Sequence, residues 1–226
     1  MNKFLELYKL QDKILEIVGR NELDFFLSGG TALHRFHFNN KFRYSEDLDF
    51  FAVNPSEIDS FYLFLNGLNN EDVPYKIITN AVNFKQLVVF DSLKIELMYD
   101  SSVKEKNFLK TKNNVLLDTI PNILSNKFEC IFNRDEPRDC FDIFCILKHT
   151  DVNILEAFDT LIQRTNLTSE EVIEKILNYP EQSLQKELLL PKSDSIYENF
   201  LKNYKDYFSD VFLDKERRTT SKKKLK

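Results

Sequence analysis

One stretch of the sequence, from Asp24 to Phe50, reads DFFLSGGTALHRFHFNNKFRYSEDLDF. Its first residues, 24–28, form a short aromatic run typical of a buried strand, and Gly29-Gly30 stops that run at a tight turn. Residues 31–38 resume as a helix, and residues 46–53 again have the character of a strand. The stretch therefore predicts strand, turn, helix and strand in that order, which is the beginning of an α/β fold.

Asp47 and Asp49 stand two residues apart on the second predicted strand. Residues two apart on a strand point to the same side, so both carboxylates are directed towards one point. Such oxygens repel one another unless a cation lies between them, and Mg²⁺ prefers hard oxygen ligands, with substrate phosphates completing its shell. The pair predicts a Mg²⁺ (or Mn²⁺) site; a pair of aspartates on a solvated edge is the alternative.

The Gly29-Gly30 turn lies between a predicted strand and a predicted helix. Glycine lets the backbone approach a phosphate closely, and a helix N-terminus offers free N–H groups. Ser28 and Thr31 add hydroxyl donors on either side. An anion-binding turn next to a two-carboxylate strand is more specific than either feature alone, although a plain tight turn is the alternative.

The elements around this stretch continue the α/β pattern. Residues 3–18 carry apolar residues at helical spacing, which predicts an amphipathic helix, and Asn54-Pro55 marks the start of another helix. Three further strands are predicted: residues 73–80, 84–90 and 93–99. Asp91-Ser92 joins the last two as a hairpin, so the sheet has about five strands of mixed direction.

Helical patterns dominate after about residue 118 and continue to about residue 208. Two clear helices are predicted at residues 119–132 and 137–148, and Thr168-Ser169-Glu170-Glu171 is a helix start. The predicted organisation is an α/β lobe, a helical lobe that completes the active site, and a basic, disordered tail: residues 1–115, 116–212 and 213–226.

The 226 residues, 42% of them hydrophobic, suffice for one substantial core with a helical appendage. Residues 215–226 carry seven Lys or Arg against one Glu, so of a net charge of −5 the rest of the chain holds −11. An acidic body suits metal chemistry and a basic tail suits phosphate or an acidic partner. A solvated, disordered end is the alternative.

Several classes of protein are excluded. The chain shows neither a basic leader followed by an apolar run nor 18 consecutive apolar residues, so we predict a cytoplasmic protein that is neither secreted nor membrane-spanning. The three cysteines and three histidines lack zinc-ligand spacing. With only four glycines, the chain contains no P-loop, nucleophile elbow or dinucleotide fingerprint.

The blocks Leu27–Leu33 and Arg43–Phe50 resemble the nucleotidyltransferase toxins of the AbiEii family, within the polymerase-β-like nucleotidyltransferase superfamily. A third block, Arg138–Ile143 preceded by Lys127, resembles later motifs of that family. The resemblance covers about residues 25–148 in the family's order. It implies a small mixed-sheet nucleotidyltransferase lobe flanked by helices, with a C-terminal helical lobe.

The resemblance assigns Asp47 and Asp49 as catalytic metal ligands. Members of the superfamily often have a third carboxylate on a neighbouring strand, and Glu96 is best placed, because the alternation in residues 93–97 puts it on the face opposite the apolar one. A plain exposed glutamate in a hairpin is the alternative for Glu96.

The resemblance also implies that Gly29, Gly30 and Thr31 hold the triphosphate. Ser28, Arg43 and Arg138 are further candidate nucleotide-binding residues. An ion pair with Glu46 is the alternative for Arg43, and an Arg–Asp pair that locks the lobes together is the alternative for Arg138. Lys127 is expected to project beside the packing stripe of its helix and neutralise phosphate charge. Asp142 is expected to be an orienting or proton-accepting carboxylate.

The implied reaction is attack of an acceptor hydroxyl on the α-phosphorus of an NTP, with release of pyrophosphate. The family includes toxins that add nucleotides to the 3′ end of tRNA, and a separately encoded antitoxin is implied, with both acting as a type IV pair. A protein side chain is the alternative acceptor. A catalytically inactive module that binds nucleotide or a partner is the alternative from a different class.

Overall fold

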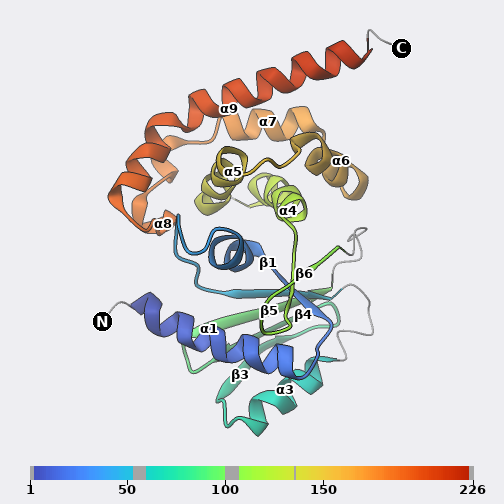
Figure 1. Cartoon of the computed structure of the whole chain (residues 1–226), viewed down its shortest axis with the longest axis vertical. Coiled ribbons are helices and arrows are strands. Elements are labelled where there is room, and N and C mark those ends of the chain that lie inside the picture. Colours follow the sequence, from blue (N-terminus) through green and yellow to red (C-terminus); the bar gives the residue numbers. More distant parts are fainter. Residues whose placement is uncertain (1–2, 53–59, 100–106, 135, 224–226) are drawn as a thin grey trace. The chain divides into compact units, whose positions relative to one another are not determined.

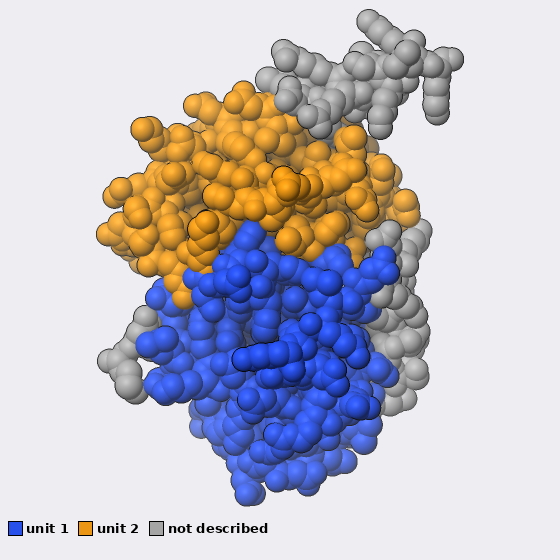
Figure 2. All heavy atoms as spheres, in the orientation of Figure 1, with its two compact units in different colours: residues 1–40, 44–119 blue, residues 41–43, 120–226 orange. Residues whose placement is uncertain are grey.

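The computed structural model describes residues 3–52, 60–99, 107–134 and 136–223. The chain forms two compact units, coloured separately in Figure 2. Unit 1 contains residues 1–40 and 44–119, and unit 2 contains residues 41–43 and 120–226. The short excursion of residues 41–43 into unit 2 was not predicted from the sequence.

Unit 1 is built on a mixed seven-stranded sheet with the strand order β3-β4-β5-β2-β1-β7-β6 (Figure 1). The strands are β1 (Phe25–Ser28), β2 (Leu48–Ala52), β3 (Tyr75–Asn80), β4 (Phe84–Val89), β5 (Leu93–Tyr99), β6 (Leu109–Lys110) and β7 (Leu116–Leu117). The predicted α/β class and mixed direction are confirmed, because β2 pairs antiparallel with β1 and parallel with β5. The prediction of about five strands missed β6 and β7, since two-residue strands are too short to show an alternation.

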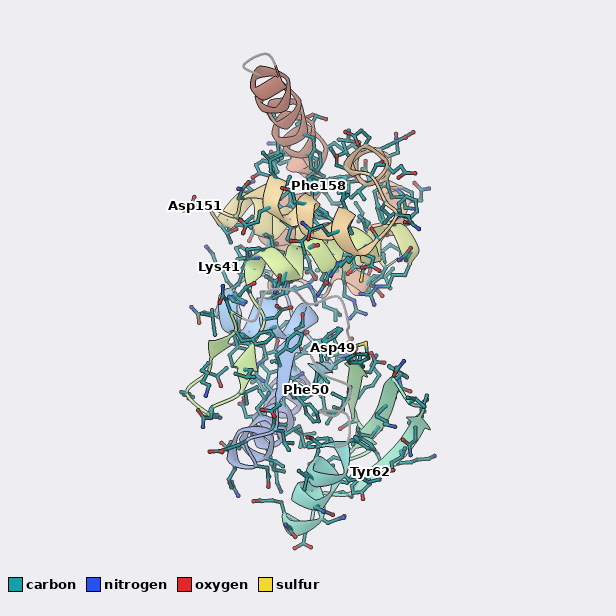
Figure 3. All side chains as sticks on the ribbon, turned by 90° about the vertical axis from the view of Figure 1, so that its right-hand side faces the viewer. Lys41, Asp49, Phe50, Tyr62, Asp151 and Phe158 are labelled. Carbon is teal, nitrogen blue, oxygen red and sulfur yellow. The ribbon has the colours of Figure 1, made fainter. Side chains whose placement is uncertain are left out.

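The register of β2 sets which side chains share a face of the sheet. Asp49 lies opposite Ser28 on β1 and opposite Glu96 on β5. Leu48, Phe50 and Ala52 are buried, while Asp49 is half-buried, as expected for alternating faces (Figure 3). Burial of the apolar set fixes the register, because a slip of one residue would expose it to solvent.

Two helices cover part of the sheet. The helix α1 (Lys3–Arg20) contacts both β5 and α3 (Ser60–Asn70) (Figure 1). The predicted helix is confirmed, and of its predicted apolar stripe Ile14 and Ile17 are buried, while Leu7 and Leu10 are half-buried. A methyl group on Gly67 of α3 would approach within 2.8 Å of Ile17 Cγ2, so glycine allows these helices to pack closely. The predicted helix start at Asn54-Pro55 lies outside the described residues.

The predicted helix after the glycine pair is present but begins earlier. It starts as α2 (Gly29–Thr31) and continues as the π-helix η1 (Ala32–His37), so the glycines are its first residues. The predicted β4–β5 hairpin is also confirmed, with Ser92 N–H donating to Val89 O at 3.1 Å.

Helices make up most of the described part of unit 2, which also contains one isolated β-bridge between Arg43 and Pro191. Its helices are α4 (Ile120–Asn133), α5 (Pro137–His149), α6 (Ile154–Arg164), α7 (Ser169–Leu177), η3 (Glu181–Ser183), α8 (Lys186–Leu189) and α9 (Asp194–Lys223). Stacked and edge-on Phe rings fill the core, including Phe128 against Phe158, 4.4 Å apart between centroids. The predicted start of α7 is confirmed by a capping box between Thr168 and Glu171.

The backbone of α9 is helical to Lys223 and so extends into the predicted basic tail, residues 213–226. The disorder of that tail and the three-part division of the chain stay predictions. Lys and Arg are good helix formers, and cations near a helix C-terminus interact favourably with the helix dipole, so a basic composition does not by itself end a helix.

Gln11 of α1 is fully buried and holds the backbone that leads into β2. Its amide nitrogen donates to the carbonyls of Ser45 (3.2 Å) and Glu46 (3.1 Å), and its oxygen accepts from Arg35 (2.9 Å). We expect Gln11→Leu to lower the free energy of unfolding by about 1–3 kcal/mol, because it leaves buried polar groups unsatisfied. Urea denaturation measures this, with Glu16→Gln on the exposed face of α1 as the control; equal stability of both variants would contradict it.

Candidate functional site

Three carboxylates from neighbouring strands gather on one face of the unit 1 sheet. We name Asp47, Asp49 and Glu96 the carboxylate cluster. Asp47 immediately precedes β2, and Asp49 and Glu96 are direct neighbours across the parallel β2–β5 pair. The register therefore brings Glu96 beside Asp49, on the sheet face where alternation along the strand had placed it.

The ammonium group of Lys94 lies among these carboxylates. Its Nζ is 3.2 Å from Asp47 Oδ2 and 3.2 Å from Glu96 Oε1. Burial alone would lower the pKa of Lys94, but the charges of Asp47 and Glu96 outweigh burial and raise it. Gln86 of β4 donates to Glu96 Oε1 at 2.8 Å and so orients that carboxylate.

Gly29 lies directly against Asp49. It adopts a left-handed conformation with φ +68°, and a methyl group on it would fall well inside the contact radius of Asp49 Oδ2. Both the dihedral angle and the available space require glycine here. The backbone of Gly29, the first residue of α2, therefore lies in close contact with the Asp49 carboxylate. Gly30 follows in the helix and is half-buried.

The hydroxyls of Ser28 and Thr31 make hydrogen bonds within unit 1. Ser28 Oγ donates to Asp118 Oδ2 at 2.6 Å, and Thr31 Oγ1 donates to the main-chain oxygen of Asp47 and lies 2.7 Å from Ser45 Oγ. Both side chains are buried. They position the turn and the backbone of Asp47, which differs from the phosphate contact that the sequence suggested for their hydroxyls.

The donor chemistry of the carboxylate cluster fits a hard divalent cation. Two of its carboxylates already converge on a single positive charge, the Lys94 ammonium. Carboxylate oxygens are the ligands that Mg²⁺ and Mn²⁺ favour. Within the described ranges, no group of three His, Cys, Asp or Glu has a ready-made metal-site arrangement.

Lys127, Asp139 and Asp142 from the third sequence block form a buried ionic cluster with Arg43 and Arg134 in unit 2. Arg43 binds Asp142 through two hydrogen bonds, of 2.7 and 2.8 Å. Lys127 Nζ lies 2.7 Å from Asp139 Oδ1 and 2.8 Å from Asp142 Oδ2. Arg134 also donates to Asp139, at 2.9 Å. We name these five residues the buried ionic cluster.

These positions change the interpretation of the predicted residues. Lys127 is buried with its ammonium between two aspartates, whereas the sequence placed it projecting beside the packing stripe. Both oxygens of Asp142 already accept hydrogen bonds or ion pairs, which favours the orienting role over proton acceptance. Arg138 donates to Glu136, the N-cap of α5, at 2.9 Å.

Burial and charge act in opposite directions on the pKa values of the buried ionic cluster. Burial would lower the pKa of Lys127, but Asp139 and Asp142 raise it above its ordinary value. Burial would raise the pKa of Asp139, but Lys127 and Arg134 lower it. The cluster therefore keeps its charges over the ordinary pH range and is tightly paired.

Sequence reasoning missed Lys94, Gln86 and Asp118 as parts of this region. Lys94 was detectable, because it stands two residues before Glu96 on the same strand face. Gln86 was detectable too, because it lies opposite Glu96 in the hairpin that the sequence predicted. Asp118 contacts Ser28 from 90 positions away, which only the fold reveals.

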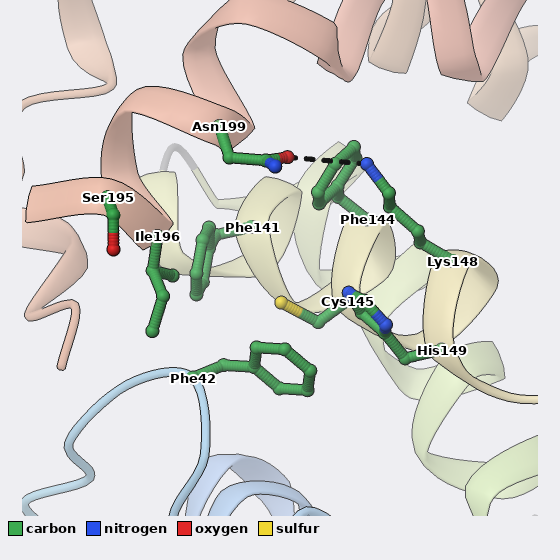
Figure 4. A pocket seen from close by; sticks show the side chains of 9 residues that line it. All are labelled: Phe42, Phe141, Phe144, Cys145, Lys148, His149, Ser195, Ile196 and Asn199. Carbon is green, nitrogen blue, oxygen red and sulfur yellow. Dashed lines mark hydrogen bonds between the residues drawn. The ribbon is translucent and has the colours of Figure 1, made fainter. Parts of the chain in front are cut away.

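Unit 2 also contains an aromatic pocket of about 310 Å³ (Figure 4). It is lined by Phe42, Phe141, Phe144, Cys145, Lys148, His149, Ser195, Ile196 and Asn199. Phe42 stacks on His149 at 4.5 Å, and Lys148 donates to Asn199 at 3.3 Å. Burial raises the pKa of Cys145 well above its usual range, so its thiol stays protonated and is a poor nucleophile. The pocket contains none of the predicted site residues.

Comparisons with known proteins agree with this geometry. Residues 18–219 match the family model described as nucleotidyl transferase AbiEii toxin, type IV toxin–antitoxin system. The solved structure of JHP933 from Helicobacter pylori is similar, with a TM-score of 0.69 and 20% identity, covering 100% of this chain and 98% of that one. MenT4, a nucleotidyltransferase toxin from Mycobacterium tuberculosis H37Rv, gives a TM-score of 0.61 at 14% identity, covering 95% and 86%.

At these identities the structural similarity shows the fold alone. A comparison with curated proteins found no match. No helix in the described part of the chain is long and apolar enough to cross a membrane.

We expect Gly29→Ala to lower the free energy of unfolding by about 1–2 kcal/mol, because an L side chain is strained at this positive φ, and to displace the Asp49 carboxylate. Thermal unfolding measures the first effect. Gly30→Ala is the matched control, since Gly30 lies in α2 and Gly29 is the glycine with a positive φ among the described residues. Equal stability of the two variants would contradict the assigned backbone constraint.

The lowered pKa of Asp139 predicts a loss of stability in acid. A depressed carboxyl pKa stabilises the fold above the unfolded value of about 3.9, and that contribution is lost as the pH falls through the folded value. We expect Asp139→Asn to lose about 3–5 kcal/mol at pH 7, since it leaves buried cations unpaired, and to show a weaker pH dependence below pH 4.

Chemical denaturation from pH 7 to pH 2 measures both effects. Asp151→Asn, an exposed position, is the control and should follow the unmodified protein (Figure 3). A pH dependence below pH 4 that Asp139→Asn leaves unchanged would contradict the account.

Proposed function

Since the chain belongs to the AbiEii nucleotidyltransferase toxin family, we propose that it transfers a nucleotide from an NTP to the 3′ end of tRNA and requires a divalent metal. The proposal is supported by the convergence of three carboxylates, Asp47, Asp49 and Glu96, at the neighbouring strands β2 and β5. The helix that begins at Gly29 lies directly against the Asp49 carboxylate. The family also implies an antitoxin partner, which is encoded separately.

The carboxylate cluster would hold Mg²⁺ or Mn²⁺, which would supply neutralisation of phosphate charge and activation of the attacking hydroxyl. The backbone N–H groups at Gly29 and Gly30 would bind the triphosphate at the start of the helix, where free donors point outward. One carboxylate of the cluster would accept the proton of the acceptor hydroxyl. Catalysis then consists mainly of positioning and charge neutralisation.

For the buried ionic cluster we propose a positioning role. Asp142 holds the guanidinium of Arg43, and only three residues of the chain separate Arg43 from Asp47. The cluster also stabilises the junction of α4 and α5, the helices that supply Lys127, Asp139 and Asp142. Arg138, whose side chain is 26% exposed at the start of α5, would contact phosphate from the third block.

The tRNA acceptor is supported by charge. The last twelve residues carry seven Lys or Arg, and the helical backbone of α9 extends into them as far as Lys223. Neutralising phosphates by such residues releases counterions and gives affinity for RNA without sequence preference.

We expect Asp47→Asn and Asp49→Asn each to reduce transfer by at least about 100-fold, since each removes charge on which transition-state stabilisation depends. The purified protein is incubated with Mg²⁺, total tRNA and each of the four NTPs in turn, tritiated in the nucleoside. Asp91→Asn makes the same change in an exposed turn of unit 1 and should retain activity.

The acceptor is tested in the same experiment with tRNA whose 3′ diol has been oxidised by periodate. Label on intact but not on oxidised tRNA supports the 3′-end assignment. Label on protein instead would replace tRNA by a protein acceptor. Absence of label on RNA and on protein with every NTP would overturn the enzymatic proposal.

A further inference from the structure

We propose that Lys94 is the built-in counter-ion of the carboxylate cluster, and that a divalent metal must displace its ammonium before it can bind. This inference rests on the proposed function, because it concerns the metal site assigned there. It gives Lys94 a defined role that follows from its position: it sets the affinity of the site for the bare metal ion.

Lys94 occupies the position where the carboxylates would bind a metal. Lys94 Nζ is equidistant, at 3.2 Å, from one oxygen of Asp47 and one of Glu96, which come from different segments of the chain. A metal bound by these same oxygens would need the space that the ammonium fills. The two cations therefore exclude one another at this position.

Lys94 also compensates the negative charge of the carboxylate cluster. Asp47, Asp49 and Glu96 carry three negative charges a short distance apart, and Lys94 supplies one positive charge in their midst. Like charges on neighbouring strands destabilise the sheet unless they are compensated. Lys94 provides that compensation while the metal is absent, so the strand pair β2–β5 stays intact.

The side chain of Lys94 is able to move away from the carboxylates. The Lys94 side chain is 39% exposed, and Asp47 is 31% exposed, so the contact lies at the surface of the sheet and is accessible to solvent. A lysine stem is long and flexible, and its ammonium can turn away into water or towards an anion. Displacement therefore requires only a change of rotamer. The two aspartates of the buried ionic cluster of unit 2, in contrast, are inaccessible to solvent.

The consequence is that metal and nucleotide favour one another. A bare divalent ion must compete with Lys94, whereas the phosphates of an incoming nucleotide offer the displaced ammonium a new anionic partner. Lys94 thus weakens the binding of metal alone and favours loading of the metal together with the triphosphate.

The test is the affinity for Mn²⁺ alone, with no nucleotide and no turnover. Free Mn²⁺ is titrated by electron paramagnetic resonance against the unmodified protein, Lys94→Met and Lys76→Met. Lys76 is an exposed lysine on β3 of the same sheet, so its loss changes the net charge equally without removing a cation from the cluster. We expect Lys94→Met to bind Mn²⁺ about tenfold more tightly, and Lys76→Met to bind it as the unmodified protein does.

A second readout is thermal unfolding in EDTA. Without its counter-ion the cluster repels itself, so Lys94→Met should unfold at a lower temperature in EDTA, and Mn²⁺ should raise that temperature more than it does for the unmodified protein. Lys94→Arg keeps the positive charge and should restore the stability in EDTA.

The outcomes separate the inference from the function on which it rests. Mn²⁺ binding that Lys94→Met leaves unchanged or weakens would overturn the role of Lys94 and leave the proposed metal site standing. No binding of Mn²⁺ by either protein would overturn the metal site itself, and the inference with it.

Discussion

The central constraint in this structure is the register of β2 between β1 and β5. That register places Ser28, Asp49 and Glu96 in one row across three strands. It is fixed by the burial of Leu48, Phe50 and Ala52 on the opposite face, so apolar packing determines where the carboxylates stand. The chemistry on one face therefore depends on the hydrophobic effect on the other.

The buried ionic cluster and the carboxylate cluster with Lys94 differ in their exposure and therefore in the roles open to them. In unit 2, Arg43, Lys127 and Arg134 enclose two aspartates that are inaccessible to solvent. Removal of one partner there leaves a buried charge, so the set acts on stability and position. In unit 1 the carboxylate cluster is half-buried around one flexible lysine, so its oxygens can exchange one cation for another. Burial, more than residue type, separates a structural from a chemical role.

Local patterns in the sequence predicted much of unit 1. Alternation along β2 and β5 was enough to place Asp47, Asp49 and Glu96 on the polar face, because strand periodicity is a local property. The helix start at Thr168 was predicted because a run of capping residues is also a local pattern. The two-residue strands β6 and β7 carry too little pattern to be recognised.

The remaining features depend on contacts between distant residues. Arg43 and Asp142 are 99 positions apart, and Ser28 and Asp118 are 90 apart, so no local rule could pair them. The same holds for residues 41–43, which join unit 2 although both flanking segments belong to unit 1. Sequence reasoning found the residue types of these sites and misjudged the exposure of Lys127, since exposure is decided by which elements pack around a helix face.

We expect the carboxylate cluster to support transfer of a nucleotide, and not of the terminal phosphate, from the NTP to the acceptor. The most direct measurement compares an NTP labelled at the α-phosphate with one labelled at the γ-phosphate, each incubated with the protein, Mg²⁺ and tRNA. The account predicts that the α-label appears on the acceptor while the γ-label is released as pyrophosphate. Appearance of the γ-label on the acceptor would contradict it.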